Sequence, residues 1–152
     1  MVSSINHGLV EYGRSGVRKT VKELVAEANA EVRSLSVEEA LPLAGDADVQ
    51  IVDVRDIRER QRDGFIPGSY HAPRGMLEFW VDPESPYYKE VLGSGKHFVL
   101  HCASGWRSAL ATKTLQDMGL ERVSHIAEGF GGWLEAGGPV SKTADGREPR
   151  DG

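Results

Sequence analysis

Three short apolar runs, each of strand length, constrain the fold of this chain more than any other feature. Residues 49–54 (Val-Gln-Ile-Val-Asp-Val) are mostly β-branched and apolar, and residues 97–101 and 123–127 form similar runs. Such runs are typical of strands that helices cover on both faces. A helical pattern follows the second run over residues 107–118. This alternation predicts an α/β fold of three layers, with a central parallel β-sheet flanked by helices.

The chain of 152 residues is long enough for one domain with its own core. We expect three segments: an N-terminal arm and amphipathic helix over residues 1–31, the α/β domain over residues 32–140, and a polar, disordered tail over residues 141–152. The helix is predicted because apolar residues recur at helical spacing. They are Val17, Val21, Leu24, Val25, Ala28 and Val32.

Charge and cysteine content exclude several function classes. A formal net charge of -5 argues against nucleic-acid and anionic-membrane partners, which require a basic face. Since no apolar stretch is long enough to span a bilayer and the first residues do not resemble a signal peptide, we expect a cytoplasmic protein. The single cysteine excludes an intrachain disulfide and a cysteine-built zinc site, and the histidines have no metal-ligand spacing.

The only cysteine, Cys102, lies where a predicted strand turns into a predicted helix. Residues 102–108 read Cys-Ala-Ser-Gly-Trp-Arg-Ser. The backbone N–H groups of such a turn have no intrahelical partner, so they can cradle an anion together with the helix dipole. Gly105 lowers the steric cost of the bend. We expect this environment to favour the Cys102 thiolate, the reactive form.

A persulfide on Cys102 fits this loop, because its charge extends one atom farther into the ring of donors. The nucleophile would then take sulfur from a donor and pass it to an acceptor. The alternative is that Cys102 is a small buried apolar residue. Arg107 could pair structurally or bind a substrate anion, while Ser104 and Trp106 could be plain surface residues or could shape access. Arg74 could hold a sulfonate or lie on the surface.

Together these residues resemble the rhodanese sulfurtransferases over roughly residues 32–140. The loop at 102–108 fits the family pattern C-x-x-G-x-R-S, and Asp53, Arg55 and Glu59 fit its D-x-R-x-x-x-E motif. Residues 64–69 are similar to its G-H-I-P-G-A turn, and residues 129–140 are similar to its closing G-F…W…G-x-P-V signature. Phe65 and Ser69 depart from that turn, where the family has His and Ala.

The resemblance implies that Cys102 becomes the persulfide and that no cofactor or metal takes part. It implies that the loop amides from Ala103 through Ser104, Gly105 and Trp106 to Arg107 bind the persulfide. Arg55 would support the loop or the donor anion, and Asp53 and Glu59 would be structural. Thiosulfate would be a donor, and cyanide, a thiol or a partner protein an acceptor.

Two competing functions remain open at this stage. Cysteine phosphatases and arsenate reductases place a thiolate in a similar cradle, but phosphatases of this kind use C-x5-R, whereas Cys102 and Arg107 are separated by four residues. The other alternative is a persulfide relay or binding module that serves a partner protein, since a fold by itself does not determine function.

Overall fold

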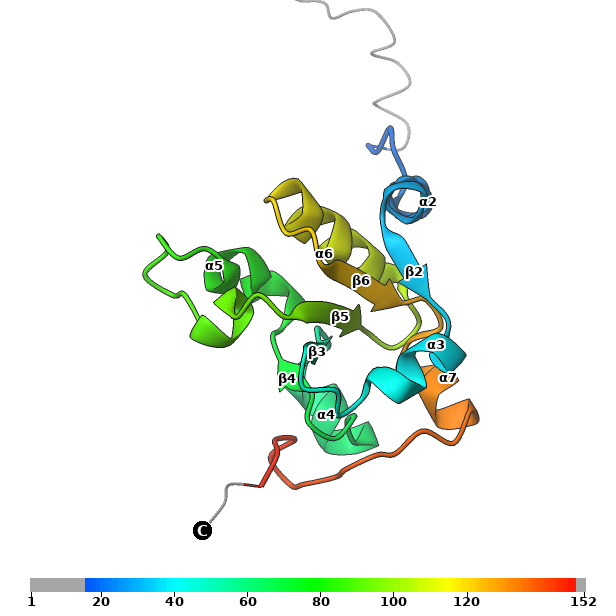
Figure 1. Ribbon diagram of the computed structural model, residues 1–152. Coiled ribbons are helices and arrows are strands. Elements are labelled where there is room, and N and C mark those ends of the chain that lie inside the picture. Colours follow the sequence, from blue (N-terminus) through cyan, green and yellow to red (C-terminus); the bar gives the residue numbers. More distant parts are fainter. Residues whose placement is uncertain (1–15, 150–152) are drawn as a thin grey trace, which may run out of the picture.

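The structure, a computed structural model, describes residues 16–149 (Figure 1). Its strands form one five-stranded sheet in the order β2-β6-β5-β3-β4, and every neighbouring pair is parallel. This confirms the predicted central parallel sheet. The strands are β2 (Arg33–Leu35), β3 (Val49–Asp53), β4 (Tyr70–His71), β5 (His97–His101) and β6 (Val123–Ile126).

Helices cover both faces of the sheet and bury two apolar clusters. One cluster packs the β5 side chains Phe98 and Leu100 against α5 and α6, and the other packs Val99 against α3 and α7. The three-layer prediction is therefore confirmed. The α-helices are α2 (Val21–Glu31), α3 (Val37–Ala40), α4 (Ile57–Asp63), α5 (Leu77–Val81), α6 (Trp106–Asp117) and α7 (Gly129–Glu135), and short 3-10 turns occur at η1 (Leu41–Leu43), η2 (Arg74–Met76) and η3 (Glu90–Gly93).

The N-terminal helix α2 lies beside α6 and strand β2 (Figure 1). It begins at Val21 rather than at Val17, because Thr20 and Glu23 form a reciprocal cap. Only Val25 and Ala28 of its apolar residues are buried, against Ala109 of α6. The helix therefore belongs to the packed structure, whereas the predicted arm over residues 1–15 lies outside the described residues.

The segment after residue 140 differs from the expected disordered tail. Ser141 and Phe65 exchange two backbone hydrogen bonds of 2.8 Å, and Arg60 donates Nε–H to the carbonyl oxygen of Gly146 at 2.7 Å. Glu148 accepts from the N–H of Gly68. These contacts run mainly through backbone groups, which a polar composition does not reveal. Residues 150–152 lie outside the described part of the chain.

Among residues 16–149, the helices lack the combination of length and apolar character that crossing a membrane requires.

Candidate active site at the Cys102 loop

Cys102 directly follows the central strand β5, at the carboxyl edge of the sheet. Alternation along β5 turns Cys102 to the same face as Phe98 and Leu100, while His101 faces the opposite cluster and stacks on Phe130 with 5.9 Å between ring centroids. The side chain of Cys102 is 1% exposed. This edge is where parallel sheets place functional groups.

The sulfur of Cys102 accepts two backbone hydrogen bonds from its own loop. The N–H of Gly105 donates to Sγ at 3.1 Å, and the N–H of Ser108 donates at 3.4 Å. Ser108 is in the first turn of α6, where N–H groups have no intrahelical acceptor. Two backbone N–H groups thus point at the sulfur, which is the kind of contact that an anion cradle requires.

Gly105 is required at its position for two reasons. Its φ of +103° lies in a region that residues with a side chain rarely adopt, and an added Cβ would overlap the carbonyl oxygen of Ala127. Gly105 thus turns the chain from the loop into α6 while it lies directly against the residue that follows β6. The bend that brings its N–H to the sulfur depends on this close approach.

Helix α7 holds the outer side of the loop. The N–H of Phe130 donates to the carbonyl oxygen of Cys102 at 2.8 Å, and the N–H of Gly131 donates to that of Ala103 at 3.1 Å. An added Cβ at Gly129, where φ is +65°, would lie 2.5 Å from the same Ala103 oxygen. Helix α7 therefore supplies the hydrogen-bond donors for the carbonyl oxygens of Cys102 and Ala103.

Several loop amides remain available for such an anion. Within residues 16–149, the backbone N–H groups of Ala103, Ser104, Trp106 and Arg107 have no acceptor. Ser104 and Trp106 are exposed, with Trp106 at 49%, whereas Gly105 is buried. The loop therefore combines exposed side chains at Ser104 and Trp106 with backbone amides that have no acceptor among the described residues.

Arg107 pairs with Glu59 of α4. Its Nη1 and Nη2 donate to the two carboxylate oxygens at 2.7 and 3.0 Å. The hydrogen bond from Arg107 holds the pKa of Glu59 below its ordinary value, and the same bond raises the pKa of Arg107. The predicted support role of Glu59 therefore has a specific form, since the carboxylate fixes the arginine beside the loop.

Asp53 and Arg55 lie in a buried ionic cluster beneath the loop. Arg55 donates Nε and Nη2 to the Asp53 carboxylate at 2.8–3.2 Å, and Arg60 adds a bond to the same group at 3.1 Å. Burial opposes the charge on Asp53, but attraction to His101 and the bonds from Arg55 outweigh it and hold the pKa of Asp53 well below its ordinary value. The structural interpretation of Asp53 agrees with these contacts.

The position of Arg55 does not suit the alternative role of binding a donor anion. The residue is 1% exposed, Nη2 also donates to the carbonyl oxygen of Gly64 at 2.8 Å, and the guanidinium stacks on the Phe130 ring. Since the N–H of Phe130 donates to the Cys102 carbonyl oxygen, these contacts connect Arg55 to the loop through α7. Arg60 is a member of this cluster that the sequence interpretation did not include.

Arg74 points to α5 and α6 instead of the loop. Its Nη1 donates to Glu78 at 2.9 Å, and its Nη2 donates to Thr114 at 3.3 Å. This i,i+4 ion pair occupies the guanidinium that we considered for a sulfonate. The contacts therefore favour the alternative of a structural surface arginine.

Two residues near the sulfur were not among the predicted site residues. The Ser108 hydroxyl lies 3.5 Å from Cys102 Sγ, and its oxygen is 2.9 Å from Nδ1 of His125 in β6. Burial lowers the pKa of His125 to about 4. The sequence places His125 inside a predicted strand. It does not show that this strand, β6, lies beside β5, which is what brings His125 close to Cys102.

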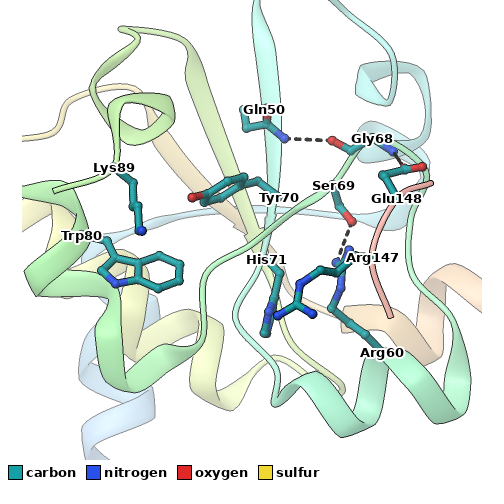
Figure 2. A pocket seen from close by; sticks show the side chains of 10 residues that line it. All are labelled: Gln50, Arg60, Gly68, Ser69, Tyr70, His71, Trp80, Lys89, Arg147 and Glu148. Atoms are coloured by element: carbon teal, nitrogen blue, oxygen red, sulfur yellow. Dashed lines mark hydrogen bonds between the residues drawn. The ribbon is translucent and has the colours of Figure 1, made fainter. Parts of the chain in front are cut away.

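A separate hollow of about 490 Å³ lies along the edge strand β4 and does not include Cys102 (Figure 2). Tyr70 and Trp80 line one side, and Arg147 and Glu148 of the C-terminal segment line the other. Arg60, at its base, donates to Ser69 and to the Asp53 cluster. Arg60, and His71 through its contact with the carbonyl oxygen of Arg55 at 2.7 Å, connect the hollow to the Asp53 cluster.

The fold and the loop define a class of protein: an α/β domain that holds one cysteine sulfur among backbone N–H groups at the carboxyl edge of a parallel sheet. The model of the rhodanese-like domain matches residues 36–136. The chain therefore belongs to the rhodanese-like family.

Known proteins of two functional descriptions resemble the chain. A Rhodopseudomonas palustris structure of unknown function, described as a possible tyrosine phosphatase, is 52% identical, with a TM-score of 0.80, and the match covers 82% of this chain and 96% of that one. The dual specificity phosphatase Cdc25 of Arabidopsis thaliana is 29% identical, over 83% of this chain and 88% of its own. The polysulfide-sulfur transferase homodimer of Wolinella succinogenes is 26% identical, with a TM-score of 0.62, over 91% and 95%.

Proposed function

We propose that this protein is a sulfurtransferase that carries a sulfane sulfur as a persulfide on Cys102. The observation that carries the proposal is the sulfur of Cys102 held by the N–H groups of Gly105 and Ser108, within a loop whose remaining amides are unpaired in the described chain. A persulfide places its charge on the outer sulfur, within reach of those amides.

The reaction consists of two displacements that balance without a cofactor. The Cys102 thiolate attacks the outer sulfur of thiosulfate, an S–S bond forms to Cys102, and sulfite leaves with the electron pair of the broken bond. Cyanide or a thiolate then attacks the outer sulfur of the persulfide, and the thiolate of Cys102 is regenerated. The loop amides stabilise the negative charge on sulfur in the thiolate and the persulfide.

The test is the intact mass of the protein after incubation with thiosulfate and again after cyanide, with Cys102→Ser as the control. We expect one added sulfur atom on the wild type only, lost to cyanide with release of thiocyanate. Added sulfur on the serine variant would refute Cys102 as the carrier. If sulfur is taken only from a persulfidated protein, the chain is a relay for a protein partner rather than a thiosulfate enzyme.

A second candidate is hydrolysis of a phosphate ester or reduction of arsenate, since two similar proteins are described as a phosphatase and a possible phosphatase. The loop geometry favours sulfur. Four residues separate Cys102 from Arg107, and the guanidinium of Arg107 is bound to Glu59. A shorter loop encloses a smaller anion.

The two candidates are separated by assaying the same preparation with para-nitrophenyl phosphate, arsenate and thiosulfate. We expect turnover of thiosulfate to exceed that of the other two. A Cys102-dependent hydrolysis of para-nitrophenyl phosphate without any sulfur uptake would replace the first proposal with the second. We also expect a cytoplasmic location, which imaging of the tagged full chain would test.

A further inference from the structure

A chain of hydrogen-bonding groups connects Cys102 to the N-terminal helix α2. Sγ lies 3.5 Å from the Ser108 hydroxyl, Ser108 Oγ lies 2.9 Å from His125 Nδ1, and His125 Nε2 lies 3.1 Å from Asn29 Oδ1. The Ser34 hydroxyl is also 3.1 Å from Nε2. Asn29 and Ser34 precede the residues 36–136 that match the family. The far end of the chain of contacts is therefore supplied by a part of this protein outside that match.

The Ser108 hydroxyl has a single hydrogen, so it can donate a hydrogen bond to only one of its neighbours at a time. Its neighbours are the sulfur, His125 Nδ1 and the carbonyl oxygen of Gly105 at 3.4 Å. If Nδ1 is unprotonated, it lies closest and takes the hydrogen. If Nδ1 carries a proton, it donates to the hydroxyl oxygen, and the hydrogen of Ser108 can turn to Sγ as a third donor.

The tautomer of the neutral His125 imidazole determines which neighbour receives the Ser108 hydrogen. The residue is 1% exposed, and burial lowers its pKa to about 4, so at neutral pH one ring nitrogen carries the hydrogen. Its neighbours are uncharged: Ser108 of α6, Asn29 of α2 and Ser34 of β2. The tautomer thus depends on hydrogen bonding at Nε2.

The charged and titratable groups around Cys102 itself are Arg107 of α6, His101 of β5 and Asp53 of β3. Arg107 is paired with Glu59, and Asp53 is paired with both Arg55 and Arg60. Burial lowers the pKa of His101, whose ring lies on the opposite face of the sheet from Cys102. These pairings leave the Ser108 hydroxyl as the polar group beside Sγ that can change direction without a change of net charge.

We propose that Asn29 and His125 are positioning residues that set the direction of the Ser108 hydroxyl, and that this direction reverses when Cys102 ionises. Asn29 and Ser34 can each donate or accept a hydrogen bond, so Nε2 is satisfied in either tautomer. When Cys102 is a thiol, each group in the series Cys102, Ser108, His125 and Asn29 donates its hydrogen to the next one, toward α2. When Cys102 is a thiolate, each group donates in the opposite direction, toward the sulfur. The inference deepens the proposed function and rests on the same reactive thiolate.

The first test observes the imidazole directly in the full chain. Nitrogen-15 chemical shifts of His125 distinguish its two neutral tautomers, and absorbance at 240 nm follows ionisation of the thiol over the same pH range. We expect the tautomer to change from Nε2–H to Nδ1–H as the thiolate forms, and to stay constant in Cys102→Ser. A tautomer that is constant in the wild type would overturn the proposal.

The second test is a double-mutant cycle that reads the rate of Cys102 alkylation by iodoacetamide. In Asn29→Asp the new carboxylate can only accept, so it keeps the hydrogen on Nε2 and turns Ser108 away from the sulfur. A lost hydrogen bond to a charged group predicts a rate about tenfold lower at pH 7. In the Ser108→Ala background we expect no further effect, because the hydroxyl is already absent.

The cycle separates this mechanism from a plain charge effect. Asn29 is an exposed residue, so the variant is expected to fold, which circular dichroism checks. An equal decrease of the alkylation rate in both backgrounds would mean that the introduced carboxylate acts on the sulfur through space. No decrease in either background would mean that α2 is not coupled to the sulfur. Either result would refute the proposal. Neither test requires sulfur transfer, so a failure of the proposed function would appear separately, in the mass measurement.

Discussion

Replacing Gly105 with alanine tests whether the loop depends on its close approach to Ala127. The chain has a matched control in Gly119, at the end of α6, whose φ of +108° is close to the +103° of Gly105 but whose added Cβ would meet nothing within 4 Å. In both variants, alanine at a positive φ lowers the free energy of unfolding by about 1–2 kcal/mol. Alanine also makes the unfolded chain less flexible, which offsets up to about 1 kcal/mol of this loss. Gly119→Ala should therefore lose about 1 kcal/mol.

Gly105→Ala carries a second cost. Its Cβ would overlap the Ala127 carbonyl oxygen and lie 3.2 Å from the carbonyl carbon, so backbone must move. Forcing extra volume into a packed site costs about 1–3 kcal/mol, which predicts a total loss of about 2–4 kcal/mol. The movement would also draw the Gly105 N–H away from Cys102 Sγ, which weakens a bond of 3.1 Å.

Urea unfolding gives the two free energies, and alkylation of Cys102 in the native state reports on the loop. We expect Gly105→Ala to be less stable than Gly119→Ala by at least about 1 kcal/mol and to alkylate more slowly at pH 7, with Gly119→Ala alkylating at the wild-type rate. If the two variants lose equal stability and alkylate equally, the contact with Ala127 does not shape the loop, and the reasoning fails.

Three further predictions concern buried or paired groups. Because burial lowers the pKa of His125 from 6.5 to about 4, the unfolded chain binds the proton first, and stability should fall by up to roughly 3 kcal/mol between pH 6.5 and 4; urea unfolding of His125→Gln should show a flatter decline. Arg74→Ala should leave the KM for thiosulfate unchanged in steady-state kinetics, because Glu78 occupies the guanidinium. A chain ending at residue 144 should lose about 1–3 kcal/mol in urea unfolding, because Arg60 loses the carbonyl of Gly146.

Each of these has its own control. A decline of His125→Gln as steep as that of the wild type would assign the acid loss to other groups. A raised KM for Arg74→Ala, with Glu78→Gln as the control for the ion pair, would restore the anion-binding role. For the tail, a chain ending at residue 149 is the control, and equal stability of the chains ending at 144 and 149 would mean that the Gly146 contact contributes nothing.

The sheet and the loop were predictable because their signals are local. The apolar runs before Asp53 and Cys102 indicate buried strands, and a cysteine between a strand and a helix indicates an N–H cradle whatever the rest of the chain does. The face of His101, opposite to that of Cys102, follows from alternation alone.

The remainder depends on contacts between segments distant in sequence. Arg60 reads as an ordinary helix residue, and only the tertiary structure buries it against Asp53 and Phe65. Arg74 follows a strand end, as a binding residue would, but its partner Glu78 lies one helical turn ahead. Ser141 and Phe65 pair through backbone hydrogen bonds, so no pattern of side chains in the sequence could predict this contact.

The boundary of the family match has a practical consequence for fragment design. A protein trimmed to residues 36–136 would lose β2, whose removal turns β6 into an outer strand with open N–H and C=O groups. All four residues of β6 are buried in the intact sheet, and an unpaired strand edge of this kind can recruit other strands. The trimmed fragment would also uncover Ala109 on α6. A minimal soluble version of this protein should therefore begin before Thr20, so that α2 and its cap are retained.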